Sequence, residues 1–315
     1  MKQNSSVFTP PTFTKDQIEE WSKYLDEEGF VVIREMLSTE DLEKGFELFK
    51  KDMKTISPKF SFECQESQNI TTTPCIFSKG MMVFNGIGQS DSMWFLRTNQ
   101  KIQQIFKTIY KTDEIVTSLD GASVFVSGEQ KSQSWLHIDQ NPKNKIYSIQ
   151  GAFNYLPVKS KADAGFVVVP KSHKTYSPKV SHSKNWIVCE EQPVEKSVKL
   201  LIPENCLTLW NSKTIHANEG MEKSLQGLNR ITCYVTFLPK SLRSEETRRK
   251  RINAYFIGGT TSHWANKCEL KQYPYGFKKR YESRGFGKII PTYEEELTDS
   301  GTIKKKIPVE RLELL

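Results

Sequence analysis

The sequence lacks the features that mark membrane and secreted proteins. No apolar run approaches the roughly 18 residues that a transmembrane helix needs. The polar residues 1–6 lead into no hydrophobic region of the kind found in a secretory signal. The C-terminal Glu313-Leu314-Leu315 is not a peroxisomal address. We therefore expect neither a membrane segment nor a targeting segment.

Cysteine is scarce and shows no pairing pattern. The six cysteines form no C-x-x-C pair, which argues against a disulfide framework. Cys206 and Cys233 lie within apolar runs, where a buried free thiol is the simplest interpretation. This usage predicts a reducing interior and a cytoplasmic location.

A large excess of one charge is also missing. The formal net charge is +8, from 45 Lys and Arg against 37 Asp and Glu. The densest basic segments lie in the last quarter of the chain, near acidic residues such as Glu245-Glu246, so a solvated surface is favoured. A surface for nucleic acid or another acidic polymer stays open but is not favoured, because no nucleic-acid-binding motif accompanies these segments. The basic segments are Arg248–Arg251, Lys278–Arg280 and Lys304–Lys306.

The first third of the chain predicts helices around a short strand. Residues 1–13 are polar with two prolines, and we expect a loosely held leader. Thr14 and Gln17 fit a capping box for a helix that ends at Gly29. A buried strand over 30–33 follows, and Ser38 then caps a second helix. A helical pattern returns over about 94–109.

From Ala122 the pattern changes to short apolar runs separated by turn residues. Many short strands at this spacing predict a β-sandwich or barrel. A basic helix over 245–257 and a tail follow, with no linker that would separate a second domain. We expect one domain over 1–315, with a core at about 122–240 and a C-terminal extension or lid at about 241–315. The expected strands span 122–126, 146–156, 166–169, 186–188, 198–202, 206–210 and 231–238.

The stretch with the most chemical information is Trp135–Pro142, which contains His137-Ile138-Asp139. Alternate residues of an extended segment point to the same side, so His137 and Asp139 aim at one point. With a histidine from a distant strand, they would form the 2-His-1-carboxylate triad that holds non-haem Fe(II) and leaves coordination positions open. His216 is the candidate third ligand.

Arg230 and Thr232 follow His216 at the start of another strand. 2-Oxoglutarate chelates Fe(II) through its keto and C1-carboxylate oxygens, which leaves its distal carboxylate free. A guanidinium binds such a carboxylate through two hydrogen bonds, and a hydroxyl two residues along the strand shares its face. We therefore assign Arg230 and Thr232 to 2-oxoglutarate.

These motifs, in this order, resemble the phytanoyl-CoA dioxygenase family of Fe(II)/2-oxoglutarate oxygenases. The resemblance covers about residues 15–240. It implies a mainly β fold with flanking helices and a double-stranded β-helix (jelly-roll, cupin-like) core. It also implies iron on His137, Asp139 and His216, and 2-oxoglutarate on Arg230, with Thr232 in place of the more usual Ser. The segments that carry the resemblance include Glu28–Val32, His137–Asp139, Ala164–Lys174, His216 and Arg230–Thr232.

The resemblance further implies a reaction. Family members that halogenate lack the carboxylate ligand, whereas this chain retains Asp139, which favours hydroxylation with release of succinate and CO2. The expected partners are O2 and a small organic substrate. One alternative is a hydroxylase of a protein or nucleic-acid group docked on the basic C-terminal region. Another is a non-catalytic metal-binding jelly roll.

Other residues are less specific. Gln133 and Ser134 are candidates for a polar group near the metal, and His263 is a candidate for the mouth of the site. His173 is read as a structural residue or one that supports the site, in preference to a direct substrate contact. Three aromatic residues are expected in the core, with Trp135 pointing away from His137; they are Trp135, Phe153 and Trp210.

Overall fold

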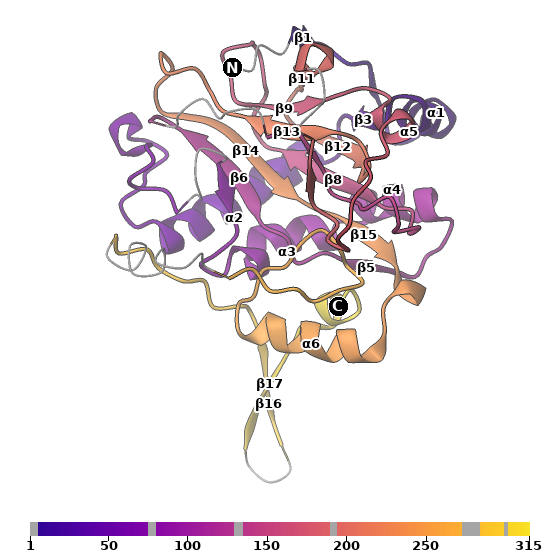
Figure 1. Ribbon diagram of the computed structural model, residues 1–315. Helices are drawn as coiled ribbons and strands as arrows, with labels where there is room; N and C mark the ends of the chain where they lie inside the picture. The colour runs from indigo at the N-terminus through magenta and orange to yellow at the C-terminus, as the bar shows by residue number, and fades with distance from the viewer. Residues whose placement is uncertain (1–5, 75–79, 129–134, 190–193, 273–283, 299–301) are drawn as a thin grey trace.

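The computed structural model describes residues 6–74, 80–128, 135–189, 194–272, 284–298 and 302–315 (Figure 1). The fold combines helices with two large sheets. The six-stranded sheet has the order β1 (Ser6–Phe8), β11 (Val198–Leu200), β9 (Gly165–Val168), β13 (His216–Glu219), β7 (His137–Ile138) and β10 (Ile187–Val188). The seven-stranded sheet has the order β2 (Thr12–Phe13), β3 (Phe30–Ile33), β12 (Cys206–Asn211), β8 (Ile149–Asn154), β14 (Leu228–Tyr234), β6 (Ala122–Val126) and β4 (Met81–Met82).

The described residues also form two small sheets and a set of α-helices. One small sheet pairs β5 (Ile115–Thr117) with β15 (Phe237–Pro239), and the other pairs β16 (Glu294–Leu297) with β17 (Ile303–Lys306). The helices are α1 (Ile18–Glu28), α2 (Thr39–Ile56), α3 (Asp91–Thr98), α4 (Gln100–Tyr110), α5 (Ser172–Thr175), α6 (Glu245–Phe256) and α8 (Val309–Leu312). Among the described helices, none has the length and apolar character needed to cross a bilayer.

Local capping explains several helix boundaries. The Ser38 hydroxyl accepts a hydrogen bond from the Asp41 backbone N–H at 3.1 Å, as expected for the start of α2. Gly29 ends α1 with φ +83°, a left-handed conformation that glycine adopts without steric cost. The expected capping box at Thr14 is wrong in detail. Gln17 accepts a hydrogen bond from the Thr14 N–H at 2.9 Å, but these residues form a turn and the helix begins at Ile18.

The helical pattern over 94–109 proved to be two helices rather than one. Asn99 separates α3 from α4, and its side-chain oxygen accepts hydrogen bonds from the N–H groups of Lys101 and Ile102 at 3.0 and 3.2 Å. This side chain satisfies N–H groups that have no partner in the first turn of α4. Likewise, the expected strand over 231–238 is divided, because β14 ends at Tyr234 and β15 begins at Phe237 in another sheet.

The N-terminal segment is more ordered than expected. A loosely held leader is wrong for residues 6–13, because β1 pairs in parallel with β11 and β2 pairs in parallel with β3. Pro10, between the two strands, is buried. Backbone hydrogen bonds to the edges of two sheets hold this polar segment, and its amino-acid composition does not predict them. Residues 1–5 lie outside the described residues.

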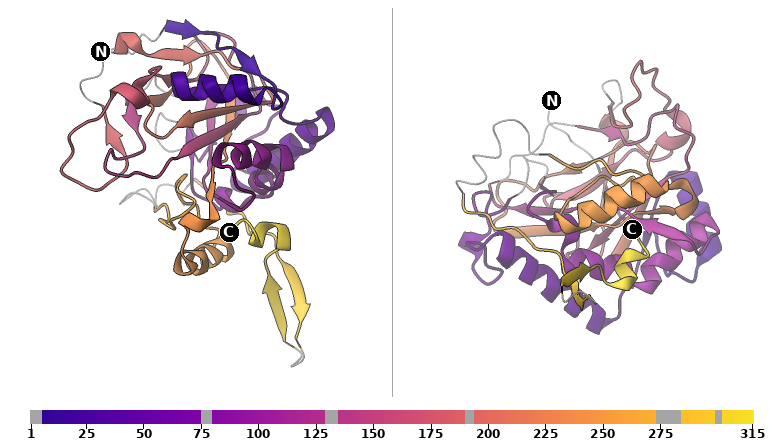
Figure 2. Two further views of the ribbon diagram at one scale, coloured as in Figure 1. Left: turned by 90° about the vertical axis from the view of Figure 1, so that its right-hand side faces the viewer. Right: turned by 90° about the horizontal axis from the view of Figure 1, so that it is seen from below.

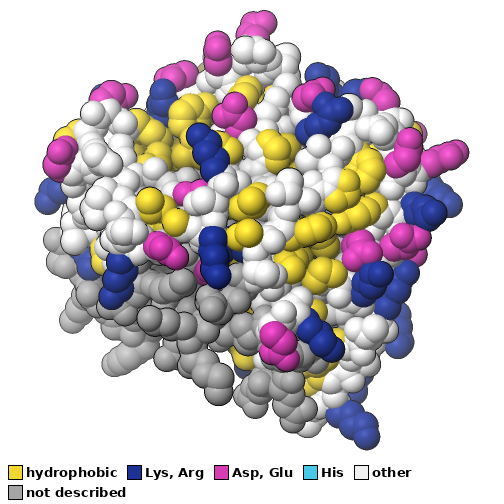
Figure 3. All heavy atoms as spheres, turned by 90° about the horizontal axis from the view of Figure 1, so that it is seen from above, with side chains coloured by type: hydrophobic (Ala, Val, Ile, Leu, Met, Phe, Trp, Pro, Cys, Tyr) yellow, Lys and Arg dark blue, Asp and Glu magenta, His cyan; other side chains and the backbone are white. Residues whose placement is uncertain are grey.

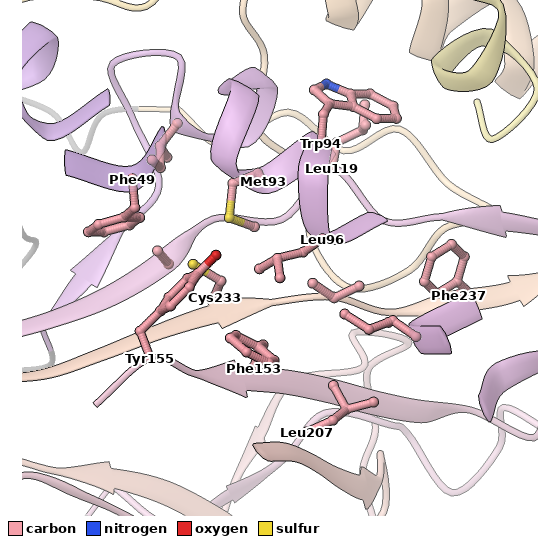
Figure 4. Close-up of a cluster of buried hydrophobic side chains, with 14 of the residues drawn as sticks. Phe49, Met93, Trp94, Leu96, Leu119, Phe153, Tyr155, Leu207, Cys233 and Phe237 are labelled. Carbon is pink, nitrogen blue, oxygen red and sulfur yellow. The ribbon is translucent and has the colours of Figure 1, made fainter. Parts of the chain in front are cut away.

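The alternation of side chains along the strands divides the apolar residues between two layers. One face of the seven-stranded sheet packs against α2, α3 and α4 (Figure 4). A second cluster contains residues from both large sheets, including Phe30, Ala152, Phe166 and Trp210, so the sheets pack face to face. Phe153 lies in the helix-covered layer, as expected for a core residue, and is fully buried.

The C-terminal region returns to the body of the protein. Leu315 is buried, and its backbone carbonyl accepts a hydrogen bond from Arg251 Nε of α6 at 3.2 Å. The β16–β17 hairpin, in contrast, projects away from the rest of the chain (Figures 1 and 2). Residues 259–271 follow α6 and reach the space beside the two large sheets, where they contribute to the cavity described next.

Candidate metal centre and its cavity

Strand pairing brings His137, Asp139 and His216 together. His137 begins β7, His216 begins β13, and the two residues are direct cross-strand partners. One Asp139 oxygen lies 3.6 Å from His137 Nε2, and the other lies 3.2 Å from His216 Nε2. The ligand atoms of the three residues all lie within 4.8 Å of one another, so they can hold a metal ion. Two imidazoles and one carboxylate are the donor set of non-haem iron sites.

The backbone sets the orientation of both imidazole rings. His137 Nδ1 lies 3.0 Å from the Trp135 carbonyl oxygen, and His216 Nδ1 lies 2.8 Å from the Thr214 carbonyl oxygen. A proton on Nδ1 satisfies each contact, and Nε2, which faces Asp139, is the nitrogen that a metal ion would bind. Hydrogen bonds of this kind hold metal-binding histidines in the required tautomer.

Asp139 is held in its ionised form. Burial alone raises the pKa of this carboxyl, but the charge of His137 and the hydrogen bond with His216 outweigh burial and hold the pKa well below the ordinary 3.8. Gln150 on β8 also donates a hydrogen bond from Nε2 to Asp139 Oδ2 at 3.0 Å. No local sequence pattern marks Gln150, because its contact with Asp139 depends on the approach of one sheet to the other.

Arg230 and Thr232 lie on β14, in the sheet opposite the one that contains His137 and His216. Arg230 is 2 % exposed, and burial lowers the pKa of its guanidinium to about 10. Its Nη1 donates to Asn218 Oδ1 at 2.8 Å, while its Nε has no hydrogen-bond partner among the described residues. The Thr232 hydroxyl donates to Asn154 Oδ1 at 3.1 Å.

A polar chain links Arg230 to the cavity. Asn218 accepts from Arg230 and donates from Nδ2 to the Tyr234 hydroxyl at 2.9 Å, which in turn lies 2.7 Å from Ser123 Oγ. Asn218 and Tyr234 both line the cavity. Tyr234 was missed, although the two-residue period of β14 that relates Arg230 to Thr232 also relates Thr232 to Tyr234.

The cavity above the triad has a volume of about 780 Å³, within the range of small-molecule sites. His137, Asp139 and His216 all line it. Its aromatic walls and its polar groups come from several different elements, including the segment after α6. The aromatic residues are Trp135, Phe166, Trp186, Trp210, Tyr234 and Trp264, and the polar residues include Asp120, Ser262, His263 and Lys271.

Two of the aromatic residues correct the sequence analysis. Trp135 was expected to point away from His137 into the core, but its ring stacks on the His137 ring with centroids 4.6 Å apart. The reason is the same two-residue period, since residues 135 and 137 share one side of an extended segment. Trp210 is buried as expected, yet it also lines the cavity and lies 5.5 Å from the His216 ring.

The remaining candidates separate clearly. His263 lines the cavity and is 7 % exposed. Burial lowers its pKa to about 4, so the ring is neutral near pH 7. His173 is on α5, where its Nε2 lies 2.8 Å from the Asp26 carbonyl oxygen at the end of α1, and it does not line the cavity. Gln133 and Ser134 lie outside the described residues.

Known proteins resemble this chain in sequence and in structure. No protein-family model matches the sequence. Ava biosynthesis cluster protein O from Aspergillus versicolor is 23% identical over 232 residues, which cover 66% of this chain and 73% of that protein.

Three solved structures share the architecture. GlcNAc Inducible Gene 2, GIG2 (DUF1479), from Candida albicans has a TM-score of 0.57 at 12% identity, over 93% of this chain and 82% of that one. The epimerase SnoN, solved with Fe3+, alpha ketoglutarate and nogalamycin RO, has a TM-score of 0.51 at 15% identity, over 71% of this chain and 84% of that one. The non-heme alpha ketoglutarate dependent carbocyclase SnoK, from nogalamycin biosynthesis, has a TM-score of 0.51 at 14% identity, over 74% and 87%. This chain therefore has the fold of proteins that include non-haem enzymes dependent on alpha-ketoglutarate, which is 2-oxoglutarate.

Proposed function

We propose that this protein is an Fe(II)- and 2-oxoglutarate-dependent oxygenase that hydroxylates a small organic molecule. The observation that carries the proposal is the cluster of His137, Asp139 and His216 at the wall of a cavity. Each histidine has its Nδ1 against a backbone carbonyl, which leaves both Nε2 atoms available as ligands. In this proposal the three residues hold iron, and the chain is a member of the phytanoyl-CoA dioxygenase-like family.

The proposal includes a double-stranded β-helix core, and the strand order supports it. The strands β11, β9, β13 and β7 are neighbours in one sheet, and β12, β8, β14 and β6 are neighbours in the other. All pairings within each set are antiparallel. The chain passes between the sheets from β6 to β9 and again from β11 to β14, as in a jelly roll of eight strands.

We assign the distal carboxylate of 2-oxoglutarate to Arg230, with Thr232 beside it on β14. Among the residues that the structure describes, no carboxylate forms an ion pair with Arg230, and its Nε has no partner. A buried charge without a counter-ion is unfavourable, and a bound carboxylate would remove that cost through charge-assisted hydrogen bonds.

When bound, iron and 2-oxoglutarate supply the oxidation, in which substrate R–H, O2 and 2-oxoglutarate give R–OH, succinate and CO2. The protein contributes orientation and exclusion of water. Gln150 and the two backbone carbonyls hold the three metal ligands, while Trp135 and Trp210 cover the histidine rings. The size and aromatic walls of the cavity support a small-molecule substrate, as bound by the structural neighbour SnoN.

Docking of a protein or nucleic acid on the basic C-terminal region is less favoured. On α6, Arg248 and Arg249 lie near Glu245 at 3.4 and 3.9 Å, and Lys250 pairs with Glu246 at 2.7 Å. These acidic neighbours weaken the attraction of the helix for a polyanion. On the opposite face of the molecule, which Figure 3 shows and which lies away from α6, acidic and basic side chains are also interspersed.

The cysteines support a reducing compartment, which we propose to be the cytoplasm. The five described cysteines are free thiols, and Cys189, Cys206 and Cys233 are buried. Burial raises the pKa of the Cys206 thiol to about 12, so this residue is unreactive and fills the core.

Anaerobic titration with Fe(II) and 2-oxoglutarate tests the assignment. We expect wild-type protein to develop the weak visible charge-transfer band of the chelate. His216→Ala should abolish the band, and Arg230→Ala should require more 2-oxoglutarate to produce it. A folded, iron-loaded wild type without the band would contradict the oxygenase proposal and favour the alternative of a non-catalytic metal-binding jelly roll.

A further inference from the structure

Two polar atoms in the cavity wall have no partner within the described part of the chain. Ser262 Oγ and His263 Nε2 are both buried, and neither forms a hydrogen bond there. Both side chains line the same cavity as the metal-binding residues. Leaving a buried donor or acceptor unsatisfied destabilises a protein, and such groups in a native structure call for an explanation.

Hydrogen bonds and packing hold the backbone on both sides of the pair, and so fix where the two side chains begin. The Thr261 N–H donates to the Leu119 carbonyl at 2.8 Å, and Gln89 Nε2 donates to the Gly259 carbonyl at 2.7 Å. The Thr260 hydroxyl accepts from the Gly88 N–H at 3.2 Å. On the other side of the pair, Trp264 is 3 % exposed and packs in a cluster with Val116 and Leu238.

The position of His263 relates the pair to the metal centre. Asp139 and His216 are among the groups that act electrostatically on His263. His263 therefore faces the same cavity contents as the triad, from a segment that follows α6 and lies outside both large sheets.

Aromatic side chains line other parts of the cavity, together with charged residues that include Asp120 and Lys271. Trp186 lines the cavity and is 50 % exposed, with its ring centroid 5.8 Å from that of His137. Trp135 and Trp264 add two further indole rings to the walls. Indole rings favour flat, apolar groups, which stack against them or meet them edge to face.

From these observations we propose that Ser262 and His263 form the polar recognition site for the substrate, and that they bind a hydroxyl or carbonyl oxygen on a hydrophobic cyclic molecule. The identification of this molecule as the substrate rests on the proposed oxygenase function. A hydroxyl and a neutral imidazole can each donate or accept, so the pair matches an uncharged oxygen substituent. Hydrogen bonding would hold one edge of the ring system while the opposite region faces the metal centre.

The experiment compares two ring compounds of similar shape, 2-naphthol and 2-methylnaphthalene, which differ in the oxygen substituent. Binding to the full-length, metal-free protein is measured by isothermal titration calorimetry. This choice separates the test from the iron and 2-oxoglutarate titration above. We expect wild-type protein to bind 2-naphthol about tenfold or more tightly than 2-methylnaphthalene, because the unsatisfied pair gains a partner only from the hydroxyl.

Variants then test whether Ser262 and His263 cause the preference for 2-naphthol. Ser262→Ala and His263→Ala should each reduce the affinity ratio at least threefold, without weakening 2-methylnaphthalene binding to a similar extent. His263→Gln replaces the imidazole by an amide that can also donate and accept a hydrogen bond, and it should keep part of the preference. His182→Ala, at an exposed histidine outside the cavity lining, is the matched control and should behave as wild type.

Thermal unfolding of each variant shows whether the fold is retained, and Ser262→Ala decides alone if His263→Ala does not fold. Equal binding of the two compounds by wild-type protein would overturn the proposal. So would failure of wild type to bind 2-naphthol, or an unchanged ratio in the folded variants. None of these outcomes depends on whether iron or 2-oxoglutarate binds.

Discussion

Replacement of Arg230 by Met should have opposite effects on stability and on cosubstrate binding. Burial lowers the pKa of the Arg230 guanidinium from 12.5 to about 10, which corresponds to about 3 kcal/mol of desolvation cost. Met removes that cost. It also removes the donor to Asn218 Oδ1 and the contact with the Phe125 ring at 5.9 Å, each worth about 1 kcal/mol. The net result for the metal-free protein is a stabilisation of about 1 kcal/mol.

The same substitution should weaken 2-oxoglutarate binding at least about 100-fold, because a bidentate contact with a carboxylate is worth about 3 kcal/mol. Urea unfolding of metal-free protein measures the first effect, and the charge-transfer titration measures the second. Arg97→Met is the matched control. Arg97 is also fully buried, but its guanidinium donates to the carbonyls of Gly88 and Asp120, both at 2.7 Å.

Loss of Arg97 leaves those two buried carbonyls unpaired, which offsets the gain from removing a guanidinium whose pKa burial lowers to about 9. Arg97→Met should therefore leave 2-oxoglutarate affinity unchanged, and this contrast with Arg230→Met in cosubstrate binding is the diagnostic result. If Arg230→Met destabilised the protein and left 2-oxoglutarate affinity unchanged, Arg230 would be a structural residue, and the reasoning from its missing counter-ion would be refuted.

Three further predictions concern stability. Burial lowers the pKa of His263 from 6.5 to about 4, so on acidification the unfolded chain is protonated at this residue before the folded protein is. The free energy of unfolding of the metal-free protein should therefore fall by about 2 kcal/mol between about pH 7.5 and pH 5, with no further fall from this residue below about pH 4. Urea unfolding of His263→Gln as a function of pH should lack this component. Lys199→Met should cost about 3–5 kcal/mol in urea unfolding, because it leaves Glu219 without the Lys199 ammonium 2.7 Å away in a fully buried pair; a cost below 1 kcal/mol would contradict this estimate. Gly29→Ala should lower the thermal unfolding temperature by an amount equivalent to about 2 kcal/mol or more, because φ is +83° and the added methyl meets the His173 ring; an unchanged melting temperature would show that the turn can relax.

Local sequence was sufficient to predict which residues form the candidate site. The spacing of His137 and Asp139 places them on one side of an extended segment, and they form a cluster with His216 that has the donor types of a metal site. Period-two reasoning failed at Trp135 only because it was applied in the wrong register. Tyr234 was likewise accessible from the spacing of Arg230 and Thr232.

Local sequence was insufficient wherever the contact partner comes from a distant element. The N-terminal strands β1 and β2 form by pairing with β11 and β3, and the composition of residues 6–13 does not indicate these pairings. The hydrogen bond of Gln150 to Asp139 joins two sheets, and the unpaired atoms of Ser262 and His263 became evident only from their surroundings.

The division has a physical cause. Ligand type, turn chemistry and side-chain alternation depend on a few neighbouring residues, so the Ser38 cap and the His137–Asp139 pair can be read along the chain. Burial, electrostatic surroundings and missing partners are properties of the packed molecule, because they arise when strands far apart in sequence share a sheet. The pairing of β13 with β7 brings His216 to His137, and packing around the cavity leaves Arg230 without a carboxylate among the described residues and His263 neutral.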